Sequence, residues 1–164
     1  MESYRPRVIL SAAISLDGKL ATRTGDSKLS SRRDKIRVHK LRSRFDAILV
    51  GKNTVEIDDP LLAVQGIKGK NPVRVILDSR ATIRASSKIL RTCSKIPTII
   101  AVSKMAKKKN LEKLKKFPVV VKVCGNNKIN IKKLLKFLKE KKIKNLLVEG
   151  GGITNWTFVK ENLV

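Results

Sequence analysis

Three consecutive glycines, Gly150, Gly151 and Gly152, separate an apolar run from a helix-like segment in LLVEGGGITNW, residues 146–156. Because glycine has no side chain, phosphate oxygens can approach the backbone N–H groups of such a turn, and the dipole of a following helix favours negative charge. These properties suit the pyrophosphate of a dinucleotide. A tight turn that needs a positive φ is the alternative, although a single glycine would be sufficient for it. The motif alone leaves both interpretations open.

Three further polar segments follow predicted strands. Thr54 and Asp58 are four residues apart, so they lie on one side of a helical turn. Ser79 and Arg80 end a strand and are suited to a terminal phosphate, such as the 2′-phosphate of NADP. The segment SLDGKLAT, residues 15–22, contains an Asp-Gly turn. Each segment also has a simpler interpretation. Thr54 and Asp58 could be local helix caps, Arg80 a loop charge, and SLDGKLAT an ordinary β-turn. Ligands of parallel sheets bind beyond the carboxyl ends of the strands, so the recurrence of polar groups there favours a binding site.

Other kinds of catalytic chemistry find little support in the sequence. The single histidine, His39, lies in a predicted helix beside two basic residues and is interpreted as a surface residue. No His, Cys or Glu constellation has metal-ligand spacing, so we expect no metal, and neither zinc hydrolysis nor zinc deamination. The serine-hydrolase motif G-x-S-x-G is absent. Cys93 and Cys124 are interpreted as reduced core thiols of a cytoplasmic protein, with a disulfide between them as the less favoured alternative.

The elements that must position these residues alternate along the chain. Apolar runs such as AILVG lack polar alternation, which is typical of strands covered on both faces. The order of strands and helices predicts an α/β fold with a largely parallel sheet in a single domain over residues 1–164. Strands are predicted at residues 7–16, 46–51, 72–79, 97–103, 117–125 and 144–150, and helices at 30–44, 51–60, 129–142 and from 153 onward.

The formal net charge of +25 favours anionic partners in general. Residues 104–144 contain 16 lysines and two glutamates, which is 16 − 2 = +14 of that total. This segment has no arginine and two aromatic residues, whereas nucleic-acid surfaces usually use both residue types. Solvated helix faces are therefore favoured, and a lysine-rich nucleic-acid-binding protein stays the alternative. No apolar stretch is long enough to span a membrane.

Four segments in this order resemble the riboflavin-biosynthesis reductases with a dihydrofolate-reductase-like fold, especially their stand-alone archaeal and fungal type. The segments are SLDGKLATRTGDSKLSS, RVHKLRSRFDAILVGKNTVEIDDPLL, NPVRVILDSR and LLVEGGGITNW. The resemblance implies a three-layer α/β/α fold with a central, mostly parallel sheet, NADPH as the cofactor, a cytoplasmic location and a homodimer. The implied reaction reduces the ribosylamino side chain of 2,5-diamino-6-ribosylaminopyrimidinone 5′-phosphate to the ribitylamino form. A reductase of the same fold for another pyrimidine or pterin is the nearest alternative.

The resemblance also implies roles for individual residues. Arg42 is expected to hold the 5′-phosphate of the substrate, and Glu149 its sugar hydroxyls. Asp17 lies in the active-site segment of the family, and our hypothesis is that it assists proton transfer as a catalytic residue, a role that a pKa raised by burial would suit. The residues implied in substrate binding are Ser27, Arg42, Leu62 and Glu149. The residues implied in cofactor binding are Thr54, Asp58, Ser79, Arg80, Gly150, Gly151, Gly152 and Ile153.

Two departures from the family pattern lead to further expectations. The family often has an arginine for the substrate phosphate where this chain has Gln65, and Lys68 or Lys70 is the expected replacement. Family members also continue for about 50 residues beyond the position of Val164, into strands that complete the sheet and help form the dimer. The resemblance therefore predicts a domain without that segment and a sheet with an uncovered edge.

Overall fold

The computed structural model describes residues 4–24, 26–27 and 29–164. Strands and helices alternate throughout these residues, as the sequence predicts. The strands are β1 (Arg7–Leu10), β2 (Ala47–Gly51), β3 (Val73–Leu77), β4 (Thr98–Val102), β5 (Val120–Val123) and β6 (Asn145–Gly150). The helices are α1 (Arg32–Arg42), α2 (Lys52–Asp58), α3 (Lys88–Arg91), α4 (Lys108–Leu114), α5 (Ile131–Glu140) and α6 (Gly152–Lys160).

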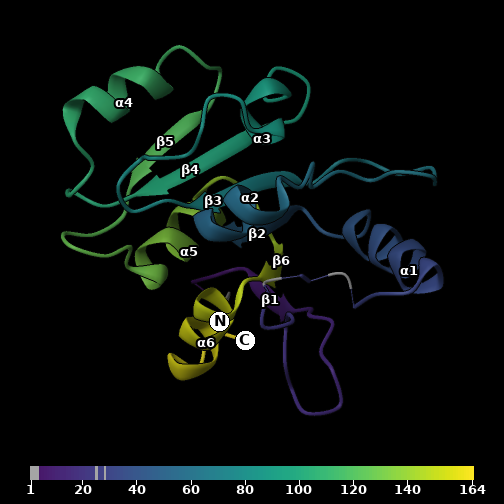
Figure 1. Cartoon of the computed structure of the whole chain (residues 1–164). Helices are drawn as coiled ribbons and strands as arrows, with labels where there is room; N and C mark the ends of the chain where they lie inside the picture. Colours follow the sequence, from purple (N-terminus) through teal and green to yellow (C-terminus); the bar gives the residue numbers. More distant parts are fainter. Residues whose placement is uncertain (1–3, 25, 28) are drawn as a thin grey trace.

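The described strands form one sheet in the order β1-β6-β2-β3-β4-β5, and every neighbouring pair is parallel (Figure 1). The predicted parallel sheet is therefore confirmed. β6 is the last strand in the sequence but lies between β1 and β2, where Val50 is the register partner of Gly150. The three-glycine turn consequently lies beside the start of α2, which carries Thr54.

Helices cover both faces of this sheet, which confirms the three-layer prediction. Ala47 and Leu49 of β2 belong to a core cluster that includes Leu134 of α5 and Phe158 of α6. Ile48 and Val50 point to the opposite face and join a cluster with side chains of α2, α3 and α4. Ala47–Val50 are at most 1% exposed, so β2 is covered on both faces, and its sequence is accordingly a continuous apolar run.

Arg74 is an exception to the apolar character of the central strands, because it is fully buried in β3. Burial lowers the pKa of Arg74 to about 10, which leaves the guanidinium charged at neutral pH. Its donors are satisfied by uncharged oxygens, which connect β3 to β4, to α3 and to the segment that precedes Leu62. These acceptors are the hydroxyls of Thr92 and Thr98 and the carbonyls of Leu61, Ile89 and Ile96.

Helix α1 lies to one side of the sheet, and none of its residues is buried (Figure 1). Ser31 caps its N-terminus, because the Ser31 hydroxyl accepts a hydrogen bond from the N–H of Asp34. His39 is half-buried at the surface of α1, and its Nδ1 accepts a hydrogen bond from the N–H of Gln65 at 3.2 Å. α1 is therefore attached to the loop after α2 through this imidazole.

The structure corrects several predicted element boundaries. β1 ends at Leu10, six residues before the predicted end at Leu16, and Leu16 is fully exposed. The short helices α3 and α4 were not predicted, because one and two helical turns carry too little periodicity to identify. Cys93 and Cys124 are both free and buried, as expected, and burial raises the pKa of the Cys124 thiol.

We expect Gly51→Ala to destabilise the protein through α6. A Cβ atom at Gly51 would lie 2.6 Å from Thr154 Oγ1, so either the Thr154 side chain must change rotamer or the end of β2 and the first turn of α6 must move apart. Such overpacking should lower the free energy of unfolding by ~1–3 kcal/mol. Urea denaturation would measure the loss. The double variant Gly51→Ala/Thr154→Ala removes the hydroxyl and should recover most of it, so an equal loss in both variants would contradict this explanation.

Candidate active site

A cleft of about 850 Å³ lies near the carboxyl ends of β1, β2 and β6. Its walls come from the loop between β1 and α1, from the inner side of α1, from α2, and from the turn between β6 and α6. The structure thereby brings together seven predicted site residues that are widely separated in the sequence. They are Ser27, Arg42, Thr54, Asp58, Leu62, Glu149 and Gly151.

Arg42 and Glu149 form a bidentate ion pair in the wall of the cleft. Arg42 Nε donates to Glu149 Oε1 at 2.9 Å, and Arg42 Nη2 donates to Glu149 Oε2 at 2.6 Å. The side chains are 15% and 13% exposed, so water screens the pair only weakly. Arg42 Nη1 also donates to the carbonyl of Ala63 at 3.3 Å. The pair connects the last turn of α1 to β6, and these contacts use three of the five N–H donors of the guanidinium.

Ser27 and Asp58 both line the cleft and contact each other. The Ser27 hydroxyl donates to Asp58 Oδ1 at 3.0 Å, which connects the loop before α1 to the last residue of α2. The family resemblance implies Ser27 in substrate binding and Asp58 in cofactor binding. Their contact means that the two predicted subsites share a boundary at the end of α2.

Thr54 fixes the glycine turn, because its Oγ1 accepts a hydrogen bond from the N–H of Gly151 at 2.9 Å. The amide of Gly151 is therefore occupied by a side chain. The amides of Gly152 and Ile153, in the first turn of α6, have no acceptor within the helix and carry its positive dipole end. The Gly150–Gly151 peptide bond is cis, and Gly150 has a φ of +114°, a conformation that favours glycine.

The remaining predicted residues do not line the cleft. Asp17 lies at an exposed turn, where its carboxylate accepts a hydrogen bond from the Ser15 hydroxyl, so it lacks the burial that would suit a proton-transfer role. The carbonyl of Ser79 accepts hydrogen bonds from Ser103, and the Arg80 side chain is exposed. The glycine-turn neighbours Gly150, Gly152 and Ile153 flank Gly151, and Ile153 is 79% exposed.

The structure also reveals cleft residues that the sequence patterns did not indicate. Lys68 and Lys70 are exposed and do not line the cleft, whereas Lys35 does. Lys35 and Arg42 are seven residues apart on α1, a spacing that places them on the same side of the helix and could have revealed the pair. Asn155, in α6, is a further missed residue of the cleft wall. An asparagine within a helix carries no distinctive sequence signal.

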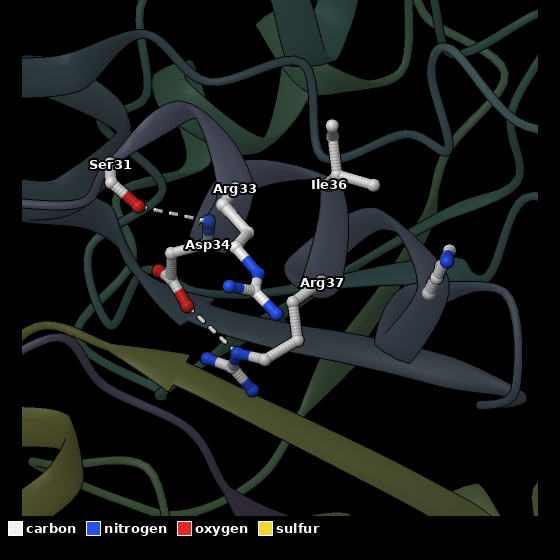
Figure 2. A pocket seen from close by; sticks show the side chains of 6 residues that line it. Ser31, Arg33, Asp34, Ile36 and Arg37 are labelled. Carbon is white, nitrogen blue, oxygen red and sulfur yellow. Dashed lines mark hydrogen bonds and ion pairs between the residues drawn. The ribbon is translucent and has the colours of Figure 1, made fainter.

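A second hollow, of about 500 Å³, lies on the outer side of α1, and those of its lining residues that the structure describes all belong to this helix and its N-cap (Figure 2). Figure 2 shows Asp34 between the Ser31 cap and Arg37, whose Nε donates to Asp34 Oδ1 at 2.7 Å. The Ser30 hydroxyl and Arg37 hold the pKa of Asp34 below its usual value. None of the predicted site residues lines this hollow, so the larger cleft is the candidate active site.

The chain has clear relatives among known proteins. The family model of the RibD C-terminal domain matches residues 6–164. The chain belongs to this family. It is 42% identical over 163 residues to the 2,5-diamino-6-ribosylamino-4(3H)-pyrimidinone 5′-phosphate reductase of Methanothermobacter thermautotrophicus, a match that covers 98% of this chain and 74% of that protein. A reductase of the same name from Aquifex aeolicus is 41% identical over 165 residues, with 98% and 73% covered.

Solved structures of RibD family members share the fold. RibD of Acinetobacter baumannii superimposes with a TM-score of 0.83 at 28% identity, over 100% of this chain and 45% of that one. The riboflavin biosynthesis reductase Rib7 of Saccharomyces cerevisiae gives a TM-score of 0.75 at 27% identity, over 100% of this chain and 71% of that one. This RibD C-terminal domain therefore has the dihydrofolate-reductase-like fold, and its predicted membership of the riboflavin-biosynthesis reductases is confirmed.

The side chains that line the cleft indicate which kind of ligand it suits. Within the part of the chain that the structure describes, no group of three or more His, Cys, Asp or Glu side chains is arranged to hold a metal ion. The polar groups of the cleft are hydroxyls, carboxylates, amides and cations from α1, which together suit a charged organic ligand. Among the described helices, none combines the length and apolar character of a membrane span.

Proposed function

We propose that this RibD-family domain reduces the ribosylamino side chain of 2,5-diamino-6-ribosylaminopyrimidinone 5′-phosphate to the ribitylamino form, with NADPH as the reductant. The observation that carries this proposal is the cleft, in which seven residues implied in substrate and cofactor binding line one cavity. The relatives named as reductases for this compound, at 41–42% identity, support the same substrate. A cytoplasmic homodimer and a single reductase domain over residues 1–164 are further parts of the proposal.

The residues beside the glycine turn fit a dinucleotide. Gly152 and Ile153 flank the cleft residue Gly151, and their first-turn amides would offer donors to a diphosphate that extends from the cleft past this turn, where the dipole of α6 adds a favourable field. Thr54 keeps the turn in place through the amide of Gly151, and Asp58 lies at the end of the same short helix. When bound, NADPH would supply the hydride that the sugar carbon receives.

The part of the cleft formed by α1 and Glu149 fits a sugar phosphate. The guanidinium of Arg42 has two N–H donors beyond its three hydrogen bonds to Glu149 and Ala63, and Lys35 adds a charge on the same side of α1. These cations would bind the 5′-phosphate, in place of the arginine that the family often has near Gln65. Glu149, held by Arg42, would accept hydrogen bonds from sugar hydroxyls and fix the reacting carbon in position.

Asp58→Ala should weaken NADPH binding by about tenfold, the loss expected for one charge-assisted hydrogen bond. Asp58 is exposed and contacts Ser27, so its removal should leave the fold intact. NADPH fluorescence titration would measure the dissociation constant, and circular dichroism would verify the fold. Asn53→Ala is the matched control, because Asn53 is exposed on the same helix and does not line the cleft. An unchanged NADPH affinity in Asp58→Ala would overturn the cofactor assignment.

The activity itself is tested by following NADPH oxidation through the absorbance of the reduced nicotinamide, with the ribosylaminopyrimidine phosphate as substrate. We expect turnover that depends on this substrate. Titration with single-stranded and duplex nucleic acid at two salt concentrations tests the alternative. Steeply salt-dependent nucleic-acid binding without NADPH binding would favour the lysine-rich nucleic-acid-binding protein instead.

A further inference from the structure

Asn155 carries an unsatisfied hydrogen-bond acceptor in the wall of the cleft. Among the residues that the structure describes, its Oδ1 is the buried side-chain oxygen or nitrogen that has no hydrogen-bond partner. The residue is only 9% exposed, so bulk water does not compensate for the missing donor. A buried polar atom without a partner is costly and needs an explanation.

The position of Asn155 connects this atom to the glycine turn. The backbone N–H of Asn155 donates to the carbonyl of Gly151 at 2.9 Å, which fixes the residue in the first turns of α6. A Cβ atom at Gly150 would lie 3.6 Å from both the oxygen and the nitrogen of the Asn155 amide. The amide therefore packs directly on the turn whose other side is held by Thr54.

The two sets of groups at the start of α6 complement each other. The first-turn amides of Gly152 and Ile153 present hydrogen-bond donors and a positive dipole end, which suit an anionic group. Asn155 presents an acceptor nearby, which suits an uncharged N–H or O–H. Rotation about χ2 of an asparagine is broad, so the amide can turn its oxygen toward a ligand in the cleft.

We propose that Asn155 is a ligand-binding residue of this cleft, whose side-chain oxygen accepts a hydrogen bond from an uncharged N–H or O–H donor of the bound cofactor or substrate. This inference rests on the proposed function. Two sources supply such a donor: the carboxamide, ribose hydroxyls or adenine amino group of the cofactor, and the amino groups or sugar hydroxyls of the pyrimidine substrate. Binding of either one would satisfy an atom that the protein alone leaves without a partner.

The test compares Asn155→Leu, which keeps the approximate size of the side chain and removes its polar atoms, with Asn155→Ala and with the unchanged protein. Val159→Ala is the control, because Val159 is exposed on the same helix and does not line the cleft. The NADPH dissociation constant, the substrate KM and kcat, and the melting temperature without ligand would be measured for each. Both variants at Asn155 should weaken the binding of one of the two ligands by about threefold to tenfold, as expected for the loss of one hydrogen bond. Asn155→Leu should also melt at a higher temperature than the unchanged protein, because an unsatisfied polar group has been removed.

Each outcome has a separate meaning. A raised NADPH dissociation constant identifies the cofactor as the source of the donor, whereas a raised substrate KM at constant NADPH affinity identifies the pyrimidine substrate. Unchanged constants for both ligands in both folded variants would overturn the role of Asn155 while leaving the proposed function intact. If the unchanged protein binds neither NADPH nor the substrate, the proposed function fails and this inference fails with it.

Discussion

Arg42→Met is expected to lower kcat/KM for the pyrimidine substrate by at least ~100-fold and the free energy of unfolding by ~3 kcal/mol. The stability loss arises because the substitution leaves the largely buried carboxylate of Glu149 without its bidentate partner. The loss of activity arises because the proposed phosphate ligand and the support of Glu149 disappear together. Steady-state kinetics and urea denaturation would measure the two effects.

A second substitution separates the structural role of the pair from its role in binding. In Arg42→Met/Glu149→Leu, apolar side chains replace both partners, so most of the lost stability should return, while activity should stay low. Lys40→Met is the matched control, since Lys40 is an exposed cation that lines the hollow on the outer side of α1. Substantial activity in the double variant would show that the ion pair only holds α1 in place.

Arg74→Met is expected to lower the free energy of unfolding by at least ~3 kcal/mol, because it leaves several buried acceptors without a donor. Those acceptors include the carbonyls of Leu61, Ile89 and Ile96, so the loss extends from β3 to α3 and to the segment before Leu62. Arg74→Lys should recover little of this stability, because an ammonium group cannot reproduce the fork of the guanidinium. Equilibrium denaturation in urea would measure both variants.

The control for Arg74 is Arg84→Met. Arg84 is an exposed arginine that donates to the carbonyl of Glu56, and surface substitutions of this kind change stability by about 0.5 kcal/mol or less. An effect of Arg74→Met no larger than that of Arg84→Met would mean that water replaces the guanidinium at low cost.

The strands that form the middle of the sheet were predictable to within a residue or two, because strands covered on both faces must be apolar throughout. Residues 46–51 and 97–103 correspond to β2 (Ala47–Gly51) and β4 (Thr98–Val102). The end of β1 was not predictable, because Ile14 and Leu16 extend the apolar pattern but are 62% and 109% exposed. Side chains that lie in a loop look the same in the sequence as side chains of a strand.

The sequence predicted which residues belong to the candidate site better than it predicted the contacts between them. The rule that ligands bind beyond the carboxyl ends of parallel strands selected Thr54, Asp58 and the glycine turn from local patterns. The contact between Arg42 and Glu149 joins residues 107 positions apart and depends on the insertion of β6 between β1 and β2. No local pattern specifies that strand order. The Asn155 oxygen is likewise unsatisfied because no hydrogen-bond donor of the described residues lies within reach of it, and only the three-dimensional packing determines that.

Helix α1 contributes no buried residue, and it meets β6 through the side chains proposed to bind the substrate. A substrate that contacts both Arg42 and Glu149 would therefore add contacts between α1 and β6. Part of its binding energy would be used to immobilise this helix. Amide hydrogens of residues 32–42 should then exchange with deuterium more slowly in the loaded enzyme, while those of β2 keep their rates. In that case substrate binding in the cleft and the ordering of α1 would be a single coupled equilibrium.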